Sequence, residues 1–119
     1  MGPDTVRTLR VWQEGIALVK ESYALTAGWP KSGLFGLTGQ IRRAAVSIPS
    51  NLAEGKGRGT SGELVRFGRI AQGSAYELDT LLEIAQELEF ADAARVAAMR
   101  KQLLSLVRQL STYTQSRQV

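Results

Sequence analysis

The sequence predicts an all-α fold, an antiparallel up-and-down four-helix bundle, on three observations. Apolar residues recur at steps of three and four through four separate segments, which is the period of an amphipathic helix. Glycine, proline and short polar residues separate the segments, and the connections that remain are short enough to join antiparallel neighbours. No segment alternates strictly between apolar and polar residues, as a half-buried strand would. The length of 119 residues predicts a single domain, residues 1–119.

The first helix is expected at about residues 5–27. Its apolar stripe runs from Leu9 to Tyr23, and the sequence from Gly28 to Pro30 opposes any continuation. A second apolar set recurs every seven residues, roughly opposite that stripe: Val11, Leu18 and Leu25. Because a helix that is apolar on two sides is buried on two sides, we expect the stripe to face the bundle and the second set to face another subunit.

The second helix is expected at about residues 37–54. Pro49 lies inside it and should kink it, because the proline ring removes an amide donor and crowds the preceding turn. A glycine-rich basic segment, residues 55–59, then predicts a loop.

The third and fourth helices are expected at about residues 61–89 and 92–115. Thr60 followed by Glu63 has the spacing of a capping box, in which the hydroxyl accepts a hydrogen bond from a free backbone amide. Asp92 is expected to cap the fourth helix in the same way.

The composition excludes several kinds of chemistry. The chain has no cysteine and no histidine, so disulfides, thiolate metal sites and the usual general base are missing. No nucleophile and base stand out as a pair. We therefore expect no catalytic residue, no metal, no cofactor and no enzymatic activity. No apolar stretch reaches the roughly 18 residues of a membrane helix, and no signal-peptide core is visible, so we expect a cytoplasmic protein without a membrane partner.

Charge is segregated along the chain, whose net charge is +4. Residues 71–94 carry six acidic groups and no basic one, whereas residues 95–119 carry five basic groups and no acid. In one interpretation the acidic groups Asp79, Glu83 and Glu87 pair with the basic fourth helix, and there is no ligand. In the other, that pairing leaves a second basic group free for the phosphates of a nucleic acid. That group consists of Arg42, Arg43, Lys56, Arg58, Arg66 and Arg69.

A polar stripe on the second helix, continued on the third, mixes short hydrogen-bonding side chains with arginine. Such a mixture suits a structural polar network, buried or between subunits, with Arg42 or Arg43 meeting Glu54 or Glu77. The candidate network residues are Ser47, Asn51, Glu54, Ser74 and Glu77. Beside them, Gly73 costs roughly 1 kcal/mol against alanine inside a helix, which predicts the close approach of another backbone.

Three segments resemble the 23S rRNA intervening-sequence family of four-helix-bundle proteins, which is related to the accessory variability protein of diversity-generating retroelements. They are residues 40–58 (QIRRAAVSIPSNLAEGKGR), 70–77 (IAQGSAYE) and 82–85 (LEIA), and the resemblance spans roughly residues 9–110. It implies a homopentameric ring or barrel without catalytic activity. The retroelement relatives are basic, which implies nucleic acid and a reverse transcriptase as partners. The acidic residues common in the family before the second helix are missing here between Pro30 and Leu37.

The sequence thus leaves two functional hypotheses. In the first, a homo-oligomer binds RNA or DNA through phosphate contacts with little sequence preference. Its aromatic residues include Trp12, Trp29 and Phe35, but no exposed platform for base stacking is evident. In the alternative, the bundle is a protein-interaction or assembly adaptor with no nucleic-acid ligand.

Overall fold

Four α-helices make up most of the chain that the computed structural model describes, residues 6–29 and 35–116. The helices are α1 (Arg10–Thr26), α2 (Phe35–Gly57), α3 (Ser61–Glu87) and α4 (Ala93–Gln115), and a 3-10 turn, η1 (Val6–Thr8), precedes α1. The described residues contain no strand, and the predicted all-α four-helix fold is confirmed. α1 begins at Arg10, later than the predicted start at about residue 5, because residues 6–8 form η1 instead. Residue 5 itself and the segment 30–34, where the acidic residues are missing, lie outside the described residues.

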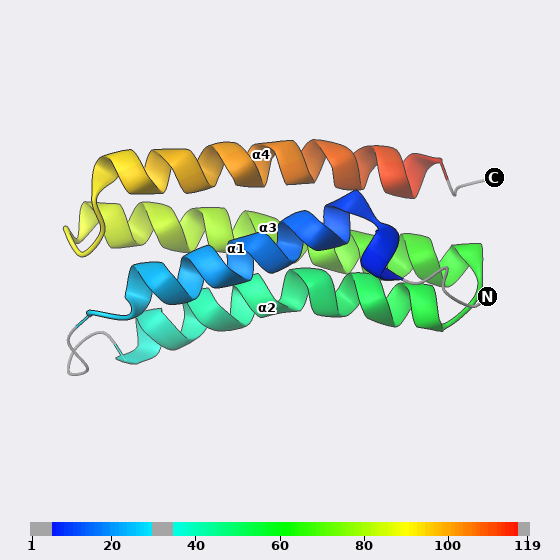
Figure 1. The fold of residues 1–119 in the computed structure, drawn as a ribbon, viewed down its shortest axis with the longest axis horizontal. Coiled ribbons are helices and arrows are strands. Elements are labelled where there is room, and N and C mark those ends of the chain that lie inside the picture. The colour runs from blue at the N-terminus through cyan, green and yellow to red at the C-terminus, as the bar shows by residue number, and fades with distance from the viewer. Residues whose placement is uncertain (1–5, 30–34, 117–119) are drawn as a thin grey trace.

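Each helix packs against two others, in the cyclic order α1, α2, α3, α4. Figure 1 shows an elongated bundle in which the end of α1, the start of α2 and the α3–α4 connection lie at one end and the α2–α3 connection lies at the other. Its principal extents are 45 × 22 × 19 Å.

The side of α1 that was predicted to face another subunit faces the core of its own chain, and the predicted core stripe is only partly buried. Val11, Leu18 and Leu25 are 5%, 1% and 6% exposed and belong to the core of their own chain. The prediction that these three side chains face another subunit is therefore wrong. In the stripe that was expected to face the core, Ile16 and Tyr23 are 36% and 44% exposed.

Small residues explain this choice of face. Gly15 and Ser22 share the buried side of α1 with Leu18. A Cβ added at Gly15 would lie 3.3 Å from Cδ of Pro49, so this side of α1 approaches α2 closely. Side chains of the size of Trp12 and Tyr23 could not be accommodated at so short a distance between helices.

Both predicted N-terminal caps are confirmed. The Thr60 hydroxyl accepts a hydrogen bond from the Glu63 amide at 3.2 Å. The Asp92 carboxylate accepts one from the Arg95 amide at 3.0 Å. These bonds satisfy amides that no earlier helical turn can reach.

α2 is longer than predicted and continues through the glycine-rich segment to Gly57. Gly55 belongs to the helix because α3 packs against it there: an added Cβ would lie 2.8 Å from Cβ of Phe67. The chain turns at Gly59, whose φ of +84° favours glycine. Pro49 lies inside α2, and the kink expected there stays a prediction.

The prediction for Gly73 is wrong. No described residue lies within 4 Å of a Cβ added there, so no backbone in the described part of the chain approaches α3 at that point. The close approach on α3 occurs instead at Gly68, where an added Cβ would lie 2.6 Å from Cγ2 of Thr114 on α4.

Candidate nucleic-acid interface

The six predicted basic residues do not form one patch. Arg42 and Arg43 lie two turns into α2, whereas Lys56, Arg58, Arg66 and Arg69 lie around the connection from α2 to α3. At 1.5 Å per helical residue, about 20 Å of α2 separates Arg43 from Lys56. The two groups therefore offer separate surfaces.

Arg42 ties α2 to the last turn of α1. Its Nε donates to Oγ1 of the buried Thr26 at 2.8 Å, and that hydroxyl donates to the carbonyl of Ser22 at 2.9 Å. The guanidinium also lies 4.3 Å from the centre of the Tyr23 ring, a cation–π contact. These contacts hold Arg42 in a structural role.

Arg43 is exposed and makes no hydrogen bond or ion pair with any described residue. Its guanidinium folds back over Gly39, where an added Cβ would lie 3.1 Å from Nη1. Within the described chain the expected pairing of Arg42 or Arg43 with Glu54 or Glu77 is not found, because Arg42 binds Thr26 and Glu54 binds Arg58. A pairing of Arg43 with Glu77 between subunits stays a prediction.

Two arginines near the α2–α3 connection are already engaged by carboxylates. Arg58 bonds Glu54 at 3.0 Å and Glu63 at 3.3 Å, and Arg66 bonds Glu63 at 2.9 Å. Both guanidinium groups also lie against the Phe67 ring. The hydrogen bond from Arg66 lowers the pKa of Glu63, so this carboxylate stays ionised at neutral pH. A phosphate would have to compete with these carboxylates for both guanidinium groups.

The other two basic residues near this connection differ in their surroundings. Lys56 is half-buried, whereas Arg69 is exposed on α3. Arg69 makes no hydrogen bond or ion pair within the described part of the chain, so its guanidinium is available to an anion.

The structure joins three of the five residues predicted for the polar network. The hydroxyls of Ser47 and Ser74 lie 2.6 Å apart, and the Asn51 amide donates to the Ser47 hydroxyl at 2.9 Å. Glu54 belongs to the arginine cluster instead. Glu77 is exposed and forms no hydrogen bond or ion pair among the described residues.

The acidic end of α3 is partly neutralised by α4, as one interpretation of the charge pattern predicted. Arg100 bonds Asp79 at 2.7 Å and Glu83 at 2.8 Å. The hydrogen bond to Asp79 raises the pKa of Arg100. On the described residues of α4, Lys101 and Arg108 remain exposed without a carboxylate partner.

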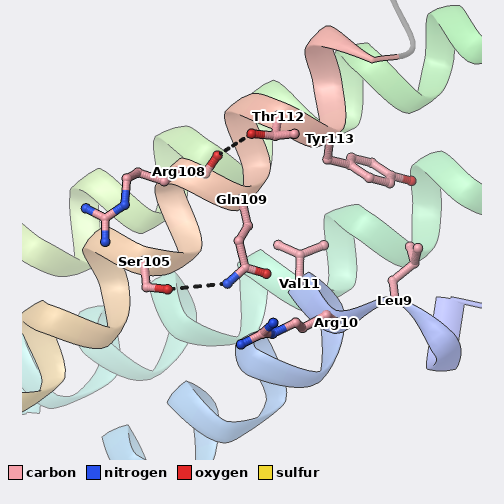
Figure 2. Close-up of a pocket in the computed structure, with 8 residues that line it drawn as sticks. All are labelled: Leu9, Arg10, Val11, Ser105, Arg108, Gln109, Thr112 and Tyr113. Atoms are coloured by element: carbon pink, nitrogen blue, oxygen red, sulfur yellow. Dashed lines mark hydrogen bonds between the residues drawn. The ribbon is translucent and has the colours of Figure 1, made fainter.

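A pocket of about 410 Å³ lies between α1 and α4, and the sequence did not signal it (Figure 2). Leu9, Val11 and Tyr113 line it. Gln109, which also borders the pocket, donates to both carboxylate oxygens of Glu14 at 2.9 Å. Figure 2 shows the Arg108 guanidinium directed away from Val11 and Tyr113, toward the outside of α4. The pocket therefore offers apolar contact rather than an array of charges.

Fold and surface together define a helical-bundle protein with distinct clusters of surface charge. The chain belongs to the 23S rRNA-intervening sequence protein family, whose family model matches residues 7–112. No curated protein matches the chain. Within the described residues, no helix is long and apolar enough to cross a membrane.

Proposed function

We propose that this protein is a non-enzymatic helical bundle that binds RNA or DNA through their phosphates. The main support is that this chain, a member of the 23S rRNA-intervening sequence protein family, has exposed cations that no carboxylate of the described residues neutralises. Such cations attract a polyanion and release its condensed counterions on binding. The surface cations in question are Lys20, Arg43, Arg69, Arg95, Lys101 and Arg108.

Binding to labelled single- and double-stranded RNA and DNA across a salt series tests this proposal. We expect affinity to fall steeply with salt, by about 0.7 in log–log slope for each phosphate contacted on a single strand. Oligonucleotides of unrelated sequence should bind alike, because phosphates carry no sequence information. If no nucleic acid binds at low salt, the proposal fails, and the assembly adaptor becomes the better hypothesis.

We also propose that the protein self-associates through the outer face between α1 and α2. Ile16 and Tyr23 are exposed on α1, and Val46 is 39% exposed on α2. The contacts of Gly15 with Pro49 and of Arg42 with Tyr23 place these side chains on one face. A second copy would remove this apolar surface from water, and an assembly would multiply each basic surface by its number of subunits.

Ile16→Glu tests self-association because it places a charge on that face outside the core. We expect light scattering to give a multiple of the 13.0 kDa chain mass for the wild type. The variant should have the mass of one chain and an unchanged helical circular dichroism spectrum. Gln102→Glu, which also introduces a carboxylate but at an exposed position of α4, should assemble like the wild type. An Ile16→Glu variant of wild-type mass would contradict the proposed interface.

A further inference from the structure

We infer that the outer face between α3 and α4 binds a single-stranded nucleic acid, with Tyr76 stacking on a base and with Arg69 and Arg108 contacting phosphates. This inference rests on the proposed function and assigns it a surface and a strand form. Of the six basic residues that the sequence predicted as phosphate contacts, this surface includes only Arg69.

Among the aromatic rings that the structure describes, Tyr76 is the most exposed. Its side chain is 55% exposed in the middle of α3, and its hydroxyl bonds to nothing in the described part of the chain. Other described aromatic rings already have a cation or a second ring against them: Arg42 lies on Tyr23, Arg58 and Arg66 lie on Phe67, and Trp29 lies against Phe90. An exposed ring offers a stacking surface that any base can use.

The hydrogen bond between Gln72 and Ser111, 2.9 Å long, sets the register of this face. Further along α3, Asp79 meets Arg100, so rising numbers on α3 correspond to falling numbers on α4. Tyr76 lies one turn beyond Gln72, and Arg108 lies one turn before Ser111. Tyr76 and Arg108 are therefore at the same level on adjacent helices.

Arg69 precedes Gln72 on α3, so it lies on the opposite side of the Gln72–Ser111 hydrogen bond from Tyr76. It is seven residues before Tyr76, so about 10 Å of helix separates the two residues along the same side of α3. A strand that runs along the face can thus meet Arg108 beside the ring and Arg69 about 10 Å further along α3.

The charge of the face favours an anion. The described residues of α4 include no acidic residue. On the adjoining side of α3, Arg100 binds the acidic groups Asp79 and Glu83. Glu87 is exposed on the same side, about 16 Å beyond Tyr76 along the helix. Lys101 and Arg108 on α4 and Arg69 on α3 therefore keep their charge available. Leu104, which is 53% exposed on α4 beside this group, adds apolar surface for a base.

The exposed Tyr76 ring and the nearby arginines together favour a single-stranded nucleic acid over a duplex. A single strand presents both its base faces and its phosphates, whereas a duplex buries the base faces in its own stack. Arg58 and Arg66 offer neither feature, because their guanidinium groups lie on carboxylates and their ring, Phe67, is buried.

Two probes of equal charge separate stacking from phosphate binding: a single-stranded oligouridine and an abasic sugar–phosphate oligomer of the same length. We expect the wild type to prefer the oligouridine. Tyr76→Ala should weaken oligouridine binding by about tenfold or more and leave binding to the abasic oligomer unchanged. Tyr76→Phe should bind both probes like the wild type, because the phenyl ring keeps the stacking surface.

The salt dependence of oligouridine binding tests which arginines contact phosphates. Arg69→Gln and Arg108→Gln should each reduce the log–log salt slope by about 0.7, the value for one phosphate of a single strand. Arg10→Gln removes an exposed charge on α1 that Glu14 already pairs, and it should leave the slope unchanged. Circular dichroism of each variant checks that the bundle is intact.

Two results would overturn this inference and leave the proposed function standing. One is equal wild-type affinity for both probes. The other is undiminished oligouridine binding by Tyr76→Ala. If the wild type binds neither probe nor any duplex at low salt, the proposed function fails, and this inference fails with it.

Discussion

Leu18→Ala should lower the free energy of unfolding by about 2–5 kcal/mol, whereas Ile16→Ala should lower it by less than about 1 kcal/mol. The two residues are neighbours on α1 and lose similar volumes. Leu18 is 1% exposed, so its truncation leaves a cavity in the core, whereas Ile16 is 36% exposed, and water can take up the space.

Urea denaturation of the two variants, followed by circular dichroism, measures this difference. It should be done at a protein concentration where each is a single chain, so that assembly does not contribute to stability. Equal losses at the two positions would contradict the assignment of the core face of α1. A larger loss for Ile16→Ala would restore the face that the sequence alone predicted.

Gly55→Ala and Gly73→Ala should have opposite effects, although both replace a helical glycine. An added Cβ at Gly55 would meet Cβ of Phe67 at 2.8 Å and the Glu63 carbonyl oxygen at 3.2 Å. Relieving that overlap requires α2 and α3 to separate, so we expect a loss of about 1–3 kcal/mol. At Gly73 an added Cβ meets nothing within 4 Å, so the helix propensity of alanine should raise stability by about 0.5–1 kcal/mol.

Thermal and urea unfolding of both glycine variants test this prediction. A Gly55→Ala variant as stable as the wild type would mean that α2 and α3 can separate there without loss. A destabilised Gly73→Ala variant, measured as a single chain, would show that the glycine has a role within its own chain that the packing does not reveal.

The helices and their caps could be predicted because their signals are local. Thr60 and Asp92 bond to amides three residues away, so sequence spacing alone was sufficient to place both caps. The apolar period likewise located all four helices, although α2 continued to Gly57, past its predicted end. That extension depends on the contact of Gly55 with Phe67, which no local pattern contains.

The candidate sites were predicted less well, because each arginine had several possible partners. Spacing suggested carboxylates for Arg42, yet a buried hydroxyl and a ring of α1 hold it. Asp79 and Glu83 were correctly expected to pair with the fourth helix, but only the register of α3 against α4 selects Arg100. The same register places Tyr76 beside Arg108.

The sequence by itself determined the fold class, the helix order, the N-terminal caps and the segregation of charge, since these follow from residues close together in the chain. The tertiary structure decided which side of α1 is buried, which arginines are occupied and which ring is exposed. These outcomes depend on distances between helices. Such distances are set by small residues such as Gly15 and Gly68, whose effect appears only when a second helix packs against them.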